Sequence, residues 1–425
     1  MPQERLARRI GLFDAIMVVM GGIVGSGIFV TPAIVASWTA TRAQMLGAWL
    51  LGGAAALIGA FIYAALSRQR PYAGGQYVYL RDAYHPAVAF LYGWALLLVI
   101  QTGGMAVCAM TFARYLGSLS GLRMAEGAMA ALALAALTAV NCLGVSAGAR
   151  VQSALMVLKI AAIAALIGCG LWLGAPGSDA GHDAQASFGA ALIPVLFSYG
   201  GFQTACFVAE EMREPRRDLP RALIIGVLAV VVLYVGVAIA CVRVLGMGGL
   251  RRSAAPALDV ATLAIGPRGA ALIGAGVAVS SLGFLSQSIL TAPRVYFAMA
   301  DDGLFFRSVA GVSARTRAPA AAIALQGAMA ALLSLWGTYE ELLRYVVAMD
   351  FIFFALSAGC LFVFRARGEP CRMPGHPLTT LSFIGICAVV VISTFVHDPA
   401  RGFIGLALTL AGLPVYLLWR RRMTT

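Results

Sequence analysis

Long apolar runs separated by short polar segments recur along the whole chain, and this pattern constrains the fold more than any other feature. Residues 44–66 and 219–245 are two examples. A helix needs about 20 mainly apolar residues to cross the hydrocarbon core of a bilayer. With 61% hydrophobic and only 12% charged residues, the chain cannot cover a water-exposed surface, because soluble domains carry roughly 25% charged residues. The sequence therefore predicts an all-α membrane protein.

The hydropathy pattern predicts twelve transmembrane helices joined by short loops, with no room for a separate soluble domain. The predicted spans are 13–37, 44–66, 86–113, 124–143, 151–174, 188–211, 219–245, 268–299, 318–336, 341–364, 378–396 and 402–419.

The basic residues give these helices an orientation. Twelve spans place both termini on the same side of the membrane. That side receives 21 of the 31 basic residues, the other side receives nine, and Lys159 lies within a span. Cytoplasmic loops carry an excess of Lys and Arg, so both termini are predicted to be cytoplasmic. The net charge of +13 thus reflects topology. We expect contact with membrane lipid and no nucleic-acid partner.

Histidine and cysteine do not follow the patterns of a cofactor or metal site. The eight cysteines show no C-x-x-C spacing. An intramembrane enzyme would need a His/acid or Ser/His group in the core, and no phosphate-binding Gly-rich Lys motif is present. We therefore expect no metal, no cofactor and no enzymatic activity. The four histidines lie near predicted helix ends, at His85, His182, His376 and His397.

Two predicted helices are interrupted by glycines. The first contains Gly21-Gly22-Ile23-Val24-Gly25-Ser26-Gly27, and the sixth contains Phe197-Ser198-Tyr199-Gly200-Gly201. Non-helical backbone at mid-membrane is tolerated only where it lines a cavity or is buried in protein. Interruptions at matching positions of two halves indicate an inverted-repeat transporter with a site at the midplane. The alternative is that these glycines only allow close helix packing.

A zwitterion suits such broken helices. An unwound stretch at Gly25–Gly27 frees N–H groups of the outer half-helix, which can receive a carboxylate. The same break leaves carbonyls near Ile23, where an ammonium can bind. The interruption at Ser198–Gly201 supplies further carbonyls. The residues therefore predict a ligand with both charges, such as a free amino acid.

Four segments resemble the amino acid–polyamine–organocation superfamily, and in particular its L-type amino acid transporter branch. They are residues 22–29, residues 197–215, the loop Pro71–Tyr79 and the segment Arg294–Leu304. The matches keep the family order over roughly residues 13–305. The tail from the ninth helix onward is similar only in hydropathy and charge.

The resemblance implies the leucine-transporter fold, with an inverted repeat of five plus five helices and two peripheral helices. Residues 1–174 would form the first repeat, residues 188–366 the second, and residues 378–425 the peripheral helices and the cytoplasmic tail. It also implies alternating access for L-amino acids, in a bacterial member located in the inner (plasma) membrane.

The resemblance further implies a substrate site at the two interruptions. Gly25, Ser26 and Gly27 would hold the substrate carboxylate. Phe197 matches an aromatic gate of the family, or is an ordinary packing residue. At Phe202 many L-type members carry Trp, which leaves the pocket size open. Carbonyls for the ammonium would come from Ile23, Phe197, Ser198 and Gly200.

Lys159 lies near the middle of the predicted fifth helix and is the only lysine among the 31 basic residues. A charge at a helix centre costs roughly 2.5–3.5 kcal/mol on insertion scales. The position matches a family lysine that replaces a sodium ion, which implies sodium-independent transport. Its expected neighbours are carbonyls near Gly21–Gly22 and the hydroxyls of Ser280 and Ser281. The alternative is that Lys159 extends to the membrane interface.

Acidic residues offer further candidates. Asp350 lies inside the predicted tenth helix, where it could accept a proton, bind a polar substrate group or pair with a neighbouring helix. Asp14, Glu210 and Glu211 lie at the cytoplasmic ends of helices one and six. With nearby arginines they could form an inner gate, or they could anchor these helices at the interface.

The sequence thus predicts a secondary transporter of neutral L-amino acids, acting as an exchanger or a proton-linked carrier. A polyamine or cationic amino acid permease is the alternative, for which only Asp350 offers an acid in the pocket. From another class, a non-transporting membrane sensor remains open. The outer loop Arg114–Glu126 contains no cysteine, so no disulfide-linked heavy chain is expected.

Overall fold

The computed structural model describes residues 6–121, 124–175, 177, 187–313, 315–336, 339–370, 372–397 and 399–423. For residues 336, 339–348, 397, 401 and 421–423 it describes the backbone alone. His182 lies outside the described residues. Nearly all of the described chain is helical, and within it the one β-type contact is an isolated bridge between Ile10 and Met212.

The helices follow one another with short connections. The α-helices are α1 (Leu12–Ile23), α2 (Thr31–Ser37), α3 (Arg42–Gln69), α4 (Gln76–Ala83), α5 (Pro86–Ala95), α6 (Gln101–Ser120), α7 (Glu126–Cys142), α8 (Val145–Gly168), α9 (Phe188–Ser198), α10 (Pro215–Arg252), α11 (Pro256–Ile265), α12 (Pro267–Thr291), α13 (Pro293–Asp301), α14 (Ala320–Trp336), α15 (Tyr339–Ala366), α16 (Leu378–His397), α17 (Pro399–Leu410) and α18 (Gly412–Met423). Short 3-10 or π segments are η1 (Gly27–Phe29), η2 (Leu96–Ile100), η3 (Cys169–Leu173), η4 (Phe202–Glu211) and η5 (Arg307–Ala310).

Nine helical stretches of the described residues are long and apolar enough to cross a membrane, which makes the chain a multi-pass membrane protein. Each coincides with one of the predicted spans. The other three predicted spans, 13–37, 124–143 and 318–336, coincide with shorter apolar helices: α1 followed by α2, then α7, then α14. The prediction of an all-helical membrane protein is therefore confirmed.

The predicted boundaries are wrong at several places. The seventh span was predicted at 219–245, whereas α10 runs from Pro215 to Arg252 with a kink at Gly246, whose φ is 63°. Pro215 starts the helix because its missing N–H would have no partner in the first turn. The helices α4 and α11 were not predicted, since eight and ten residues are too few to produce a membrane-length apolar run.

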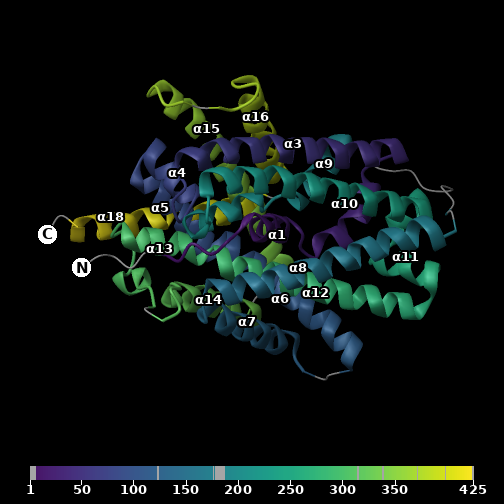
Figure 1. Ribbon diagram of the computed structural model, residues 1–425. Coiled ribbons are helices and arrows are strands. Elements are labelled where there is room, and N and C mark those ends of the chain that lie inside the picture. The colour runs from purple at the N-terminus through teal and green to yellow at the C-terminus, as the bar shows by residue number, and fades with distance from the viewer. Residues whose placement is uncertain are drawn as a thin grey trace.

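The helices run broadly along one direction, and the two ends of the chain lie at the same end of the bundle (Figure 1). Helix α1 lies in the middle of the bundle, and eight of its twelve residues are buried. Helices α3, α9 and α10 cover one side of it, whereas α7 and α14 lie on the opposite side (Figure 1). The interrupted first helix is therefore surrounded by protein along most of its length.

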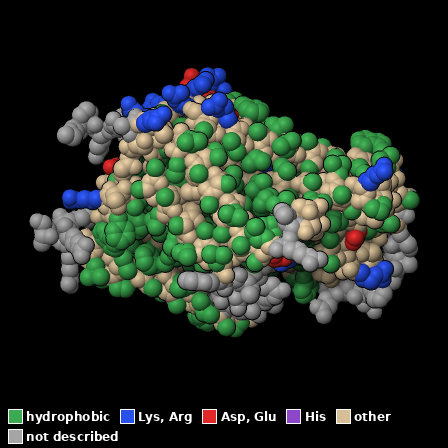
Figure 2. All heavy atoms as spheres, turned by 90° about the horizontal axis from the view of Figure 1, so that it is seen from below, with side chains coloured by type: hydrophobic (Ala, Val, Ile, Leu, Met, Phe, Trp, Pro, Cys, Tyr) green, Lys and Arg blue, Asp and Glu red, His purple; other side chains and the backbone are tan. Residues whose placement is uncertain are grey.

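The outer surface has the chemistry of a lipid-facing surface. Figure 2 shows one long face whose middle is covered mainly by hydrophobic and uncharged side chains, while Lys and Arg side chains gather at its margins. Large apolar side chains such as Leu228, Val389 and Phe403 are exposed. In water such a surface would mark an aggregation site, but in lipid it is the favourable one.

Helix α10 contacts both halves of the interrupted first helix. A Cβ on Gly226 would lie 2.7 Å from Cγ1 of Val19, so α10 packs closely against α1. Beyond the kink at Gly246, Arg251 donates hydrogen bonds to the carbonyls of Ala36 (3.0 Å) and Thr39 (2.7 Å) at the end of α2. A cationic side chain satisfies such terminal carbonyls.

Candidate functional site

The first helix is broken between its two halves. α1 ends at Ile23, and Val24 follows with an extended backbone (φ −78°, ψ 100°). The chain resumes helical turns at η1 and then at α2. The break therefore covers Val24–Ser26. It overlaps the predicted unwound stretch Gly25–Gly27, whereas Gly21 and Gly22 of the same glycine-rich segment lie inside α1.

The glycines of this segment have two different tasks. A Cβ on Gly21 would lie 2.0 Å from Nε2 of Gln152, and a Cβ on Gly22 would lie 2.6 Å from the carbonyl oxygen of Gly201. These two glycines permit close packing, as the alternative interpretation proposed. Around Gly25 and Gly27 no atom comes within 3.7 Å of the position of a Cβ. A Cβ at either position would make ordinary van der Waals contact, so close packing does not require glycine there.

A second break interrupts the sixth helix, as the sequence predicted. α9 ends at Ser198, and a turn through Gly201 leads into η4. Gly201 has φ 100°, a left-handed conformation that glycine adopts without the steric penalty of a Cβ. The hydroxyl of Ser198 lies 2.8 Å from the carbonyl of Pro194 and 3.2 Å from Oγ1 of Thr31 in α2. The end of α9 is thus joined to the outer half of the first helix.

Side chains from three neighbouring helices donate hydrogen bonds to successive carbonyls at the end of α1. The last carbonyls of a helix have no partner within the helix and carry partial negative charge. Here donors from three helices provide those partners. The pairs are Tyr234 of α10 with Ile23 (3.1 Å), Lys159 of α8 with Val24, and Ser280 of α12 with Gly25 (2.9 Å).

Lys159 is completely buried, so the alternative that it extends to the membrane interface is wrong. Gly283 of α12 leaves space for it, because a Cβ there would lie 3.0 Å from Cε of Lys159. The carbonyl that Lys159 contacts belongs to Val24 and not to Gly21 or Gly22, since α1 continues through both glycines. The hydroxyl of Ser281, predicted as a neighbour, is hydrogen-bonded to Val277 in its own helix.

The N–H groups of the break have the opposite polarity. Within the described residues, the backbone N–H groups of Gly25, Ser26 and Gly27 donate to no backbone carbonyl outside the regular helices, and the backbone of Ser26 is hydrogen-bonded to the thiol of Cys108 in α6. Ser26 is buried, whereas Gly27 is exposed. Adjacent backbone N–H groups outside a regular helix form a site suited to an anion. The break therefore offers donors on one side and carbonyls on the other.

The remaining predicted site residues lie in different surroundings. Phe197 is half-buried and packs against the core. Phe202 is buried and stacks on Phe354 at 5.7 Å between ring centroids, with Tyr63 on its edge. Asp350 on α15 is half-buried, and no ion pair with it is found within the described residues. Its role stays a prediction.

The acidic end of the sixth helix forms a buried ion pair. Glu211 lies 3.0 Å from a guanidinium nitrogen of Arg294 in α13, and both side chains are at most 1% exposed. Because Glu211 is buried, the alternative that it anchors the helix at the membrane interface is wrong. Removing one partner of a buried pair costs about 3–5 kcal/mol. The other two acids have partners as well: Asp14 lies 2.9 Å from Oγ of Ser153, and Glu210 accepts the N–H of Ala73 at 3.4 Å.

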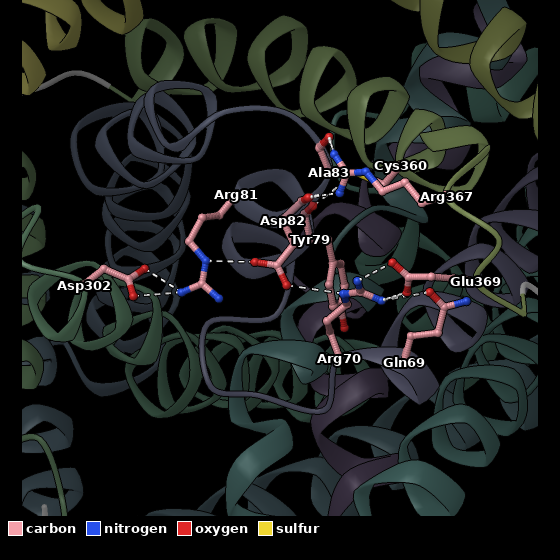
Figure 3. Close-up of polar contacts among 10 residues, drawn as sticks. All are labelled: Gln69, Arg70, Tyr79, Arg81, Asp82, Ala83, Asp302, Cys360, Arg367 and Glu369. Carbon is pink, nitrogen blue, oxygen red and sulfur yellow. Dashed lines mark hydrogen bonds and ion pairs between the residues drawn. The ribbon is translucent and has the colours of Figure 1, made fainter. Parts of the chain in front are cut away.

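A chain of ion pairs at one end of the bundle was not predicted. In Figure 3, Arg81 of α4 joins Asp302 (2.7 Å) to Asp82 (2.9 Å), and Asp82 continues to Arg70 (3.3 Å), which binds Glu369. The hydrogen bonds from Arg70 hold the pKa of the Glu369 carboxyl below its usual value. Arg70, Asp302 and Glu369 follow α3, α13 and α15, so the cluster fastens these three segments to α4.

No local sequence pattern predicts this cluster, because its members are up to 299 residues apart in the chain. The nearest signal was the resemblance of Pro71–Tyr79, which ends just before Arg81. Arg367 strengthens the same end by donating to the carbonyls of Asp82 (2.5 Å) and Ala83 (2.9 Å), where α4 ends. The guanidinium of Arg70 also lies 4.0 Å from the ring centre of Phe364.

An all-helical membrane chain with two interrupted helices, whose breaks place non-helical backbone in the interior, has the arrangement of a secondary transporter. Residues 10–413 match the amino acid permease family, and the chain belongs to this family. The match extends well beyond residue 305, so it includes the tail that the sequence motifs did not cover.

Several relatives are similar over nearly the whole chain. The serine/threonine exchanger SteT of Bacillus subtilis is 31% identical, over 98% of this chain and 98% of that protein. The human b(0,+)-type amino acid transporter 1 is 29% identical over 97% of this chain and 88% of its own length. The mouse large neutral amino acids transporter small subunit 2 is 29% identical over 97% and 81%.

The family and these relatives establish the coarse function. The chain is an amino acid transporter that spans the membrane several times, and it is not an enzyme. The predicted membership of the superfamily is confirmed.

Proposed function

We propose that the chain is a sodium-independent exchanger of neutral L-amino acids that works by alternating access. The observation that carries this proposal is the first break, where the carbonyl of Ile23 at the end of α1 and the N–H groups of Gly25–Gly27 lie outside the regular backbone hydrogen bonds of a continuous helix. A free amino acid has an ammonium and a carboxylate on one carbon. It therefore matches two opposite backbone polarities that lie close together.

In this proposal the substrate bridges the two breaks. Ser26 and Gly27, with Gly25, bind the carboxylate through N–H groups. Ile23 contributes a carbonyl to the ammonium, using the lone pair that Tyr234 leaves unoccupied. The sixth helix contributes further carbonyls from Phe197, Ser198 and Gly200, and the ring of Phe197 covers the substrate from outside.

Lys159 takes the place of a coupling cation. Its ammonium contacts the Val24 carbonyl, and Ser280 contacts the next one. A fixed positive charge at this point makes a sodium ion both unnecessary and electrostatically unfavourable. The network connects the break with α8 and α12, so a change at the substrate can alter how these helices pack. Ser281 belongs to the same stretch of α12.

The proposed architecture has twelve spans and an inverted repeat. Residues 1–174 form the first repeat, residues 188–366 the second, and residues 378–425 the peripheral helices. The support is the equivalent position of the two breaks, each in the first helix of its repeat. Both termini are proposed to lie in the cytoplasm of a bacterial plasma membrane, in line with the charge distribution and the resemblance to a Bacillus subtilis exchanger.

No disulfide-linked heavy chain is proposed, because the outer loop Arg114–Glu126 has no cysteine. Exchange is preferred over proton-linked uptake because the similar protein of Bacillus subtilis is named an exchanger of serine and threonine. Small neutral amino acids are therefore the first substrates to test.

Counterflow in proteoliposomes tests the proposal. Vesicles loaded with unlabelled serine should take up radiolabelled serine or threonine, whereas empty vesicles should not. Replacing sodium with choline should leave the rate unchanged. Arginine and putrescine in place of serine test the cationic alternative.

Three results would contradict parts of this proposal. Accumulation in empty vesicles driven by a proton gradient would mean proton-linked uptake. A strict sodium requirement would remove the role of Lys159 as a replacement cation. Uptake of arginine or putrescine, but not of serine, would move the substrate to the cationic class.

A further inference from the structure

A neutral hydrogen-bond cluster lies next to the break of the sixth helix. Nε2 of Gln287 in α12 donates to Oγ1 of Thr204 in η4 at 2.7 Å, and Thr204 in turn donates to the carbonyl of Gly201 at 2.7 Å. Gln287 is completely buried and Thr204 is 4% exposed. The closing turn of the break is therefore held from a different helix.

Helix α1, the inner half of the first helix, packs against the Gly201 carbonyl, Thr204 and Gln287. A Cβ on Gly22 would lie 2.6 Å from the Gly201 carbonyl oxygen, 2.6 Å from Oγ1 of Thr204 and 3.2 Å from Nε2 of Gln287. The cluster is thus the point where α1, η4 and α12 meet. It lies between the two breaks and the end of the bundle that holds both chain termini, because α1 runs from that end to its break (Figure 1).

The side chain of Gln287 is fixed in this position. Its second N–H lies 3.2 Å from Oγ1 of Thr291, and that hydroxyl donates to the carbonyl of Gln287 itself at 3.0 Å. Further from the break, the same two elements are joined again by the Glu211–Arg294 ion pair, since α13 continues from α12. Two separate contacts therefore hold η4 against α12 and α13.

We infer that Gln287 is a positioning residue of the transport cycle. Through Thr204 it holds the Gly201 carbonyl, against which Gly22 packs. The Gln287–Thr204 hydrogen bond forms only while the substrate path between α1, η4 and α12 is closed on the side of the chain termini. The inference rests on the proposed function, since it gives that path a role in alternating access. Gln287 does not itself touch the substrate.

The physical consequence is a shift between two conformers. An interaction present in only one conformer changes their populations by its own net free energy. A typical buried hydrogen bond corresponds to a factor of about three to ten in that equilibrium. Breaking the bond should therefore weaken apparent affinity on the opposite side and strengthen it on the side of the termini, because affinity scales with the competent fraction.

The test uses Gln287→Leu, Thr204→Val and the double variant. The KM of serine exchange is measured from each side, in right-side-out and in inverted membrane vesicles. We expect each single change to raise KM about three- to tenfold on the side away from the termini and to lower it on the other. The double variant should equal the single ones, and Thr204→Ser should restore the values of the unchanged protein.

Thr409→Val serves as the matched control, because Thr409 is also buried but donates only within its own helix, to Gly405 at 2.9 Å. Equal KM changes on both sides, or effects that multiply in the double variant, would overturn the inference. If Gln287→Leu does not fold, the comparison of Thr204→Val with Thr204→Ser decides the matter alone. Absence of serine exchange in the unchanged protein would instead contradict the proposed function.

Discussion

At the scale of single residues, Lys159 illustrates how a charge is made tolerable inside a membrane protein. Its ammonium contacts the carbonyl that follows the last residue of α1, where the helix dipole is negative. Lysine is compact at its tip, and Gly283 removes the one side chain that would occupy the same space. An arginine would place a wider planar group there.

Replacing Lys159 with Met keeps the length of the side chain and removes its donor. We expect the rate of serine counterflow to fall at least about fivefold, since a buried acceptor that loses its partner costs roughly 1–3 kcal/mol. Binding of serine, measured by thermal stabilisation, should remain. Leu158→Met, at a lipid-exposed position, is the control and should behave as the unchanged protein. Full flux in Lys159→Met would remove the proposed coupling role.

At this scale the sequence predicted the special residue but not its partner. The single lysine within apolar surroundings identified Lys159, and its burial is confirmed. The expected contact at Gly21–Gly22 was wrong by two residues. Whether a helix continues through glycines depends on what packs against them, and here Gln152 and Gly201 approach so closely that both glycines remain helical. Such contacts come from distant parts of the chain.

At the scale of elements, the turn of the second break meets the backbone of α1 just before the first break. Gly201 adopts a left-handed conformation, and a Cβ there would lie 2.1 Å from the carbonyl oxygen of Gly22. Both breaks were predictable because clustered glycines at mid-membrane are unusual. Their contact was not, since it joins two distant segments and no local pattern specifies which two helices meet.

Gly201→Ala should damage the protein more than an ordinary glycine replacement. The new methyl group meets a backbone carbonyl that cannot move aside, and the left-handed conformation adds about 1–2 kcal/mol. We expect a lower thermal stability in detergent and a loss of exchange of more than tenfold. Gly47→Ala in α3, where no atom lies within 4 Å of the new group, is the control. Equal behaviour of the two variants would refute this account of the contact.

At the scale of the whole molecule, the ion pairs of Arg70 and Arg81 hold one end of the bundle together. They connect the segments after α3, α13 and α15 with α4, so the short helix α4 is fastened on several sides (Figure 3). Hydropathy found the long helices because each carries its own signal. It could not find α4 or this cluster, whose stability depends on pairings between remote segments.

The cluster predicts a pH dependence of stability. Because Arg70 lowers the pKa of Glu369 in the folded protein, the stabilising contribution is complete above the ordinary pKa of a glutamate and is lost as the pH falls through the lowered value. The carboxyl is partly exposed, so its contribution is at most about 1 kcal/mol. Thermal unfolding of Glu369→Gln should show a deficit at pH 7 that disappears below about pH 4.

Glu214→Gln provides the comparison, because the Glu214–Arg217 pair is exposed on both sides and should contribute nothing measurable at any pH. A deficit in Glu369→Gln that stays constant from pH 7 to pH 3 would mean that packing, and not charge, accounts for the effect.

Helix α10 contacts the interrupted first helix on both sides of its break. It contacts Val19 in α1, the carbonyl of Ile23 where α1 ends, and the carbonyl of Ala36 in α2. These contacts couple the angle between the two halves of the first helix to the shape of α10. Helix α10 is itself kinked at Gly246, between Tyr234, which binds Ile23, and Arg251, which binds Ala36. We therefore expect a change in the angle between α1 and α2 to bend α10 at Gly246, since α10 is bound to both.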